Sequence, residues 1–200
     1  MRKLRARTQL WPMRGTFRIS RGARTETPTI IAEIEEAGDV GKAECVPYPR
    51  YGESNGSVLA EIESMRLAVE GGMTRAALQD ALPAGAARNA LDCALWDLEA
   101  KQSGKRAWEL AGIDPPPPVM SAMTLSLDTP ENMAKAARAS AHLPLLKLKM
   151  TGEGDLERVT AVRAGAPDSR LIVDANEGWR PGMLDSLLPA LAGLGVEMVE

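Results

Sequence analysis

Two lysines one residue apart, Lys147 and Lys149, are the first side chains in this sequence that could do chemistry. They lie in a short apolar run, Leu145–Met150, that is typical of a β-strand. Side chains alternate along a strand, so both ammonium groups point to one face and Leu148 points to the other. Two like charges side by side near a metal ion lower a lysine pKa, which makes a general base available. The alternative interpretation is an edge strand whose lysines prevent aggregation.

Two carboxylates follow at the ends of the next two predicted strands. Asp174 ends the apolar run Leu171–Val173, which is typical of a strand buried on both faces, and Glu200 occupies the same position one strand later. Carboxylate oxygens are hard ligands of the kind that magnesium prefers, so both residues are candidate metal ligands. The alternatives are an Asp that makes a local turn and a charged residue at a chain end, with Glu197 as a competing candidate.

The elements that carry these residues alternate between strand and helix. After the proline run Pro115–Pro118, strands are predicted at 119–127, 145–150, 170–174 and 196–200, with helices at 130–142, 155–164 and 181–194. This alternation is typical of parallel βαβ units in a barrel or a doubly wound sheet. No G-x-G-x-x-G follows a strand, which disfavours a dinucleotide-binding fold. An eight-stranded barrel takes about 250 residues, so we expect only about its first half here.

Residues 1–114 show a different pattern and predict an α+β domain. A β-branched run at 29–34, the turn signal Ala37–Asp39 and a strand near 42–46 indicate a small antiparallel sheet. Ser57 is a candidate cap for a helix that runs to about Glu70. A second helix is predicted over 86–103, ending at Gly104, with an apolar stripe three or four residues apart at Ala87, Leu91, Ala94, Leu95 and Leu98.

Composition excludes several classes of protein. The chain is 44% hydrophobic and 26% charged with a net charge of -3, which argues against a nucleic-acid or membrane-surface binder. The basic start, with no acidic residue before Glu26, is read as a strand pair with a basic solvent face, with an RNA- or lipid-binding arm as the alternative. No run is apolar for long enough to span a bilayer, and no signal peptide is predicted. Two cysteines are too few for a disulfide framework, so a cytoplasmic location is expected.

Taken together, Lys147-Leu148-Lys149, Asp174-Ala175-Asn176 and Glu200 resemble the enolase superfamily in its muconate-lactonising subgroup. Ala90–Leu98 looks like the helix that these enzymes carry just before their barrel. The resemblance implies an α/β fold: an N-terminal capping domain, residues 1–114, and then residues 115–200 as the start of a TIM-like (β/α)7β barrel. Within the subgroup, Ile19–Arg24 and Cys45–Glu53 resemble the specificity loops of the L-Ala-D/L-Glu and related dipeptide epimerases.

The resemblance implies a role for each candidate residue in α-proton abstraction from a dipeptide of the Ala-Glu type. Lys149 would be the base, and Lys147 would lie near the substrate carboxylate and help to keep Lys149 neutral. Asp174 and Glu200 would be two of three ligands of one Mg2+ per site, with Asn176 orienting a ligand from behind. For the substrate, Arg24 would pair with a side-chain carboxylate and Thr124 would line the pocket.

Other functions remain open at this point. A cycloisomerase, an o-succinylbenzoate synthase or an N-acylamino acid racemase would share the lysines and the metal ligands. A non-catalytic scaffold that retains part of the fold is the alternative from another class. Superfamily members often form homo-oligomers, but no pattern in the sequence identifies an interface.

We predict that residues 1–200 alone have no measurable turnover. The third metal ligand and the opposite-face base of this subgroup come from later strands, and an open half-barrel exposes apolar strand edges. An assay of the purified 200-residue chain with dipeptide substrates checks this expectation. Measurable turnover would contradict it.

Overall fold

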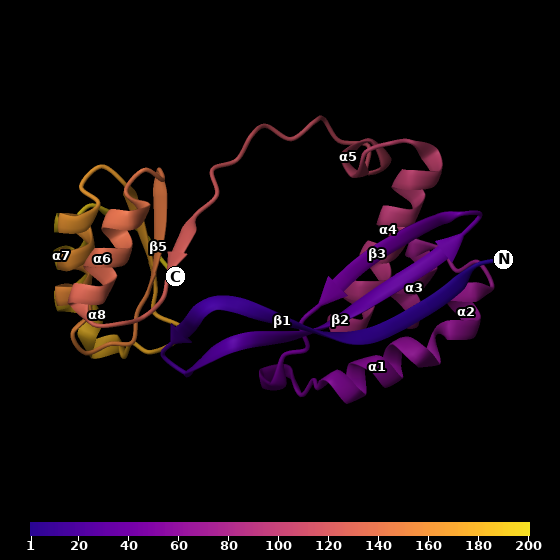
Figure 1. Cartoon of the computed structure of the whole chain (residues 1–200), viewed down its shortest axis with the longest axis horizontal. Coiled ribbons are helices and arrows are strands. Elements are labelled where there is room, and N and C mark those ends of the chain that lie inside the picture. The colour runs from indigo at the N-terminus through magenta and orange to yellow at the C-terminus, as the bar shows by residue number, and fades with distance from the viewer. The chain divides into compact units, whose positions relative to one another are not determined.

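A computed structural model describes all residues, Met1–Glu200, and divides the chain into two compact units (Figure 1). The first unit comprises Met1–Pro12 and Glu26–Pro117, and the second comprises Met13–Thr25 and Pro118–Glu200. The segment Met13–Thr25, the hairpin tip, therefore groups with the second unit although it lies early in the sequence. The predicted domains, 1–114 and 115–200, place the main division within a few residues of Pro117, but that prediction assigned the hairpin tip to the first domain.

The first unit is built on an antiparallel sheet with the strand order β1-β2-β3. Its strands are β1 (Lys3–Ile19), β2 (Gly22–Glu36) and β3 (Asp39–Cys45). Between β2 and β3, Ala37 and Gly38 form a two-residue turn with φ angles of 55° and 97°. Positive φ at both turn residues matches the right-handed twist of a hairpin. The predicted sheet and turn are confirmed.

Helix α4 covers β3 because its apolar side chains repeat at helical spacing. The helices of this unit are η1 (Pro49–Tyr51), α1 (Asn55–Ser64), α2 (Arg66–Glu70), α3 (Arg75–Ala81), α4 (Ala86–Ser103) and α5 (Ala107–Leu110). All residues of the predicted α4 stripe are buried, and Gly104 ends the helix with φ 67°. This part of the prediction is confirmed.

The predicted helix that is capped by Ser57 and runs to about Glu70 was wrong at its start and its end. Ser54, rather than Ser57, is the N-cap of α1, and its hydroxyl accepts a hydrogen bond from the Ser57 amide at 3.1 Å. Ser57 completes a capping box, in which its own hydroxyl accepts from the Ser54 amide. The helix also stops at Ser64, and α2 begins after Met65. Helices α3 and α5 were not predicted.

The second unit contains a parallel sheet with helices on one side (Figure 1). Its elements are β4 (Met123–Leu125), α6 (Pro130–Ser140), β5 (Leu145–Lys149), α7 (Asp155–Gly165), β6 (Arg170–Asp174), α8 (Pro181–Gly193) and β7 (Val196–Val199). Neighbouring strands follow the sequence order without a reversal, and α6, α7 and α8 lie next to one another. A doubly wound sheet would reverse the order and cover both faces, so the arrangement is that of a partial barrel.

The two edge strands of this sheet, β4 and β7, can be compared with the sequence expectation. The first strand is shorter than the predicted 119–127, since β4 covers Met123–Leu125 alone. At the other edge of the sheet, Val199 of β7 is 41% exposed, as expected for apolar strand edges in an open half-barrel. No helix in either unit combines the length and the apolar composition that crossing a membrane requires.

We predict that Gly41→Ala destabilises the first unit. A Cβ at Gly41 of β3 would lie 2.1 Å from the Ala94 carbonyl oxygen and 2.6 Å from the Leu98 Cβ of α4, so strand and helix would have to separate. Overpacking of this kind costs about 1–3 kcal/mol of unfolding free energy, which urea denaturation measures. Gly56→Ala is the control, because the nearest atom to its Cβ is 3.9 Å away. Equal stability of the two variants would contradict the prediction.

Candidate functional site

Hydrogen bonds between parallel strands bring three predicted site residues to one level of the sheet. Lys149 at the end of β5 is in register with Asp174 at the end of β6. Glu200 continues this ladder, because its amide donates to the Val173 carbonyl at 2.8 Å and its carbonyl accepts from the Ala175 amide at 3.0 Å. Lys149, Asp174 and Glu200 therefore stand side by side at adjacent strand ends.

The alternation of side chains gives the two faces of this sheet opposite character. Leu146 and Leu148 of β5 and Leu171 and Val173 of β6 are fully buried in the core beneath the helices. Lys147 and Lys149 point to the other face, as their spacing predicts. The apolar layer thus fixes the strands, while the charged residues lie on the side that becomes the interior of a barrel.

Lys147, Lys149, Asp174 and Glu200 form a connected charge cluster. The Lys149 Nζ donates to Asp174 Oδ2 at 2.5 Å, and the Lys147 Nζ lies 3.1 Å from the same oxygen. Lys147 also donates to Glu200 Oε2. The side chains of Asp174 and Lys149 are 5% and 11% exposed, whereas that of Glu200 is 57% exposed. Burial is deepest around the Lys149–Asp174 pair.

The pKa values in the cluster follow from these contacts. Burial alone would raise the pKa of Asp174, but hydrogen bonds from Lys149, the Asn176 amide and Lys147 lower it below its ordinary value. Burial would likewise lower the pKa of Lys147, but hydrogen bonds to Glu200 and Asp174 raise it. The nearest charges of Lys147 are carboxylates, which favour its protonated form.

The donor set suits a hard divalent cation. Asp174 and Glu200 converge on the single ammonium of Lys147, so their carboxylates are close enough to share one positive charge. In the turn after Asp174, the side-chain oxygen of Asn176 is buried and has no hydrogen-bond partner. Buried polar atoms are normally paired, so this oxygen is an unused acceptor, and the two convergent carboxylates are ligands of the kind that hold a cation such as Mg2+.

The backbone of the turn after β6, residues Ala175–Gly178, orients Asp174. Asn176 and Glu177 are two consecutive non-glycine residues with positive φ, 47° and 63°. In this conformation the Asn176 amide donates to Asp174 Oδ1 at 2.8 Å. The main chain of Asn176 thus fixes the orientation of the Asp174 carboxylate.

A second buried carboxylate, Asp155, was missed by the sequence analysis. Its side chain is fully buried at the start of α7 and accepts from the Thr151 amide at 3.1 Å and the Gly152 amide at 2.7 Å. It also accepts from Trp179 Nε1 at 2.7 Å and from Arg158 at 3.0 Å. Asp155 therefore ties the loop after Lys149 to the loop after Asp174. An acid directly after a glycine-containing strand-to-helix loop was the signal that could have identified it.

The two predicted substrate-binding residues lie in the same unit as the charge cluster. Thr124 of β4 is in register with Lys147, so its side chain shares the face of the lysines. Arg24 lies in the hairpin tip, where it is exposed and its Cζ is 5.8 Å from the centroid of the Phe17 ring. Arg24 makes no hydrogen bond or ion pair with the four residues of the charge cluster.

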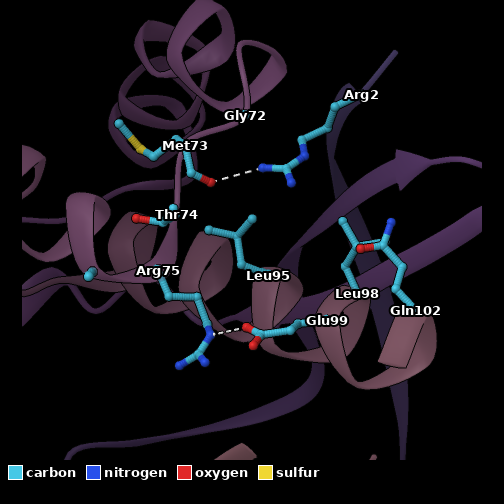
Figure 2. Close-up of a pocket in the computed structure, with 10 residues that line it drawn as sticks. Arg2, Gly72, Met73, Thr74, Arg75, Leu95, Leu98, Glu99 and Gln102 are labelled. Carbon is cyan, nitrogen blue, oxygen red and sulfur yellow. Dashed lines mark hydrogen bonds and ion pairs between the residues drawn. The ribbon is translucent and has the colours of Figure 1, made fainter. Parts of the chain in front are cut away.

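The first unit has a separate cavity of about 430 Å3 that contains none of the predicted site residues (Figure 2). Its walls carry two arginines, but both have partners. Arg2 donates to the Met73 carbonyl at 2.9 Å and pairs with Glu36, and Arg75 pairs with Glu99 at 2.7 Å. The cavity offers a ligand no unpaired charge, so the charge cluster is the stronger candidate site.

Two family models match the chain. Residues 1–112 match the family model described as mandelate racemase / muconate lactonizing enzyme, N-terminal domain. Residues 131–200 match the model described as enolase C-terminal domain-like.

The similar proteins include dipeptide epimerases and an N-acetyl-D-glutamate racemase. The chain is 46% identical to the L-Ala-D/L-Glu epimerase of Escherichia coli (strain K12), over 100% of this chain and 63% of the relative. A solved enolase family member from Agrobacterium tumefaciens, with bound sodium and L-Ala-L-Glu, has 46% identity and a TM-score of 0.94 over 100% of this chain and 61% of its own. The dipeptide epimerase of Enterococcus faecalis V583, complexed with Mg and L-Leu-L-Tyr, has 30% identity and a TM-score of 0.86 over 98% and 59%. The chain thus spans about three fifths of the length of these relatives.

We predict that Asp155→Asn destabilises the second unit. The amide nitrogen cannot accept a hydrogen bond, so a buried donor such as the Trp179 Nε1–H or the Gly152 amide loses its partner. Such a loss costs about 1–3 kcal/mol of unfolding free energy, which urea denaturation measures. Asp168→Asn, an exposed residue of the same unit, is the control. If both variants unfold at the same urea concentration, the assigned role of Asp155 is wrong.

Proposed function

Since the chain belongs to the mandelate racemase and muconate-lactonizing enzyme family of the enolase superfamily, we propose that the full-length protein is a magnesium-dependent dipeptide epimerase. The observation that carries the proposal is the charge cluster, in which two lysines meet two carboxylates at adjacent ends of parallel strands. The similarity to dipeptide epimerases over the whole chain supports the substrate class. The proposed substrate is a dipeptide of the Ala-Glu type.

Asp174 and Glu200 would hold the magnesium ion as two of its carboxylate ligands. When bound, the ion acts as a Lewis acid that stabilises negative charge on the substrate carboxylate as the α-proton leaves. Asn176 supports this arrangement through its amide, which holds Asp174 Oδ1 at 2.8 Å. Ligand carboxylates that are fixed in this way bind metal more tightly than mobile ones.

Lys149 is the proposed base that takes the α-proton, and Lys147 the residue that faces the substrate carboxylate. The Lys149 side chain is 11% exposed, so its Nζ works in a largely water-free environment where proton transfer is sensitive to its neighbours. The Asp174 oxygen 2.5 Å away fixes the position of that Nζ.

Arg24 and Thr124 are the proposed substrate contacts. The guanidinium of Arg24 presents two parallel donors, a geometry that suits the side-chain carboxylate of a glutamyl residue. Arg24 is exposed in the hairpin tip, which belongs to the second unit. The Thr124 side chain shares its face with Lys147, where it would line the pocket next to the substrate.

A proton-exchange assay tests the proposal. In heavy water, the full-length protein with Mg2+ is expected to incorporate deuterium at the α-carbon of Ala-Glu, detected by mass spectrometry, and to lose this activity in EDTA. Lys149→Met should lower the rate by about 10²–10⁴-fold, because it removes the base without adding charge. Lys135→Met, which changes an exposed lysine of α6, should leave the rate unchanged.

The substrate panel of the same assay separates the alternatives. It includes N-acylamino acids and cycloisomerase substrates beside dipeptides. Exchange into N-acylamino acids alone would indicate that the protein is an N-acylamino acid racemase and not a dipeptide epimerase. No exchange into any substrate together with no Mg2+ binding would favour a scaffold that retains part of the fold.

A further inference from the structure

The turn of the long hairpin binds the turn that follows β6. Ser20 and Arg21 are the two residues between β1 and β2, and both reach the same atom. The Ser20 hydroxyl donates to the Asn176 carbonyl at 3.0 Å, and the Arg21 guanidinium donates to it at 2.8 Å. Arg21 also forms an ion pair with Glu177 at 3.7 Å. Two donors thus converge on one carbonyl, beside the backbone that orients Asp174.

The bound turn has an unfavourable backbone that needs outside support. Asn176 and Glu177 both have positive φ, a region that residues other than glycine seldom occupy. Such a conformation persists where the surroundings fix it, and here the carbonyl between these two residues is the atom that Ser20 and Arg21 hold. The following residue closes the turn, since the Gly178 amide donates to the Ala175 carbonyl at 2.8 Å.

A second contact keeps the hairpin tip in place. The Leu127 amide donates to the Arg18 carbonyl at 3.1 Å, and the Arg18 amide donates to the Ser126 hydroxyl at 3.3 Å. Ser126 in turn donates to the Thr16 carbonyl at 3.3 Å. The tip is therefore attached to the segment after β4 as well as to the turn after β6, so Ser20 and Arg21 approach Asn176 from a fixed position.

We propose that Ser20 and Arg21 are positioning residues for the metal-binding carboxylate. By holding the Asn176 carbonyl they keep Asn176 and Glu177 in the left-handed conformation, in which the Asn176 amide faces Asp174 Oδ1. Loss of the two donors lets the turn relax, so Asp174 loses its fixed orientation and binds Mg2+ less tightly. The expected loss of Mg2+ affinity rests on the proposed function, because that function requires the metal. The expected relaxation of the turn does not depend on it.

The test compares hydrogen exchange and Mg2+ affinity in full-length variants. In the Ser20→Ala/Arg21→Met double variant, the Asn176 and Gly178 amides should exchange at least about tenfold faster by mass spectrometry, since both are hydrogen-bonded in the turn. The Kd for Mg2+, measured by calorimetry, should rise about 10–100-fold, as for other losses of support behind a metal ligand. Arg21→Lys retains one donor and should show a smaller change in both.

The control is Arg14→Met, which removes an exposed arginine from the same hairpin tip and should change neither quantity. If the double variant does not fold, Ser20→Ala alone gives the same comparison. Unchanged exchange at Asn176 and Gly178 would overturn the proposal, and so would faster exchange with unchanged Mg2+ affinity. Absence of deuterium uptake by any substrate would count against the proposed function alone, because the exchange and affinity readouts do not use turnover.

Discussion

The parallel register of β5, β6 and β7 is the constraint on which the rest of the structure depends. It places Lys149, Asp174 and Glu200 at one level on adjacent strands, although each lies 25 or 26 residues after the one before it in the sequence. A shift of one residue in any strand would move a charged side chain into the apolar layer beneath the helices. The buried leucines of β5 and the helices that cover them therefore fix the charge cluster as much as its own contacts do.

The charge cluster is stable because its charges compensate one another. Two ammonium groups face two carboxylates, and the most buried pair, Lys149 and Asp174, is joined by a hydrogen bond of 2.5 Å. Burial of an unpaired charge would cost several kcal/mol, which is comparable with the free energy of unfolding of a whole domain. A ligand that enters the charge cluster must compensate each charge whose partner it displaces. The site therefore suits a cation, which pairs with the carboxylates, together with an anionic group, which pairs with the ammonium groups.

The sequence predicted those parts of the structure that depend on local patterns. Helix α4 and its stripe, the turn at Ala37–Gly38 and the strand ends at Lys149 and Asp174 follow from spacing and side-chain type. Three features do not follow from local patterns: the choice of Ser54 over Ser57 as the cap of α1, the grouping of the hairpin tip with the second unit, and the Ser20 and Arg21 contacts. The first depends on competition between caps, and the other two depend on residues more than a hundred positions away. Asp155 is an intermediate case. Its position after a strand-to-helix loop could have been predicted from the sequence, but its hydrogen bond with Trp179 could not.

The two-residue turn at Ser20 and Arg21 also limits how the chain can vary in length. Exposed hairpin turns are ordinarily the sites where proteins accept insertions, affinity tags or circular permutation. One extra residue in a strand advances the chain by about 3.3 Å and reverses the direction of every later side chain. An insertion in β1 or β2 would therefore carry both donors away from the Asn176 carbonyl. Despite its exposure, this turn is a poor place to splice in foreign sequence, and engineering of the chain should begin elsewhere.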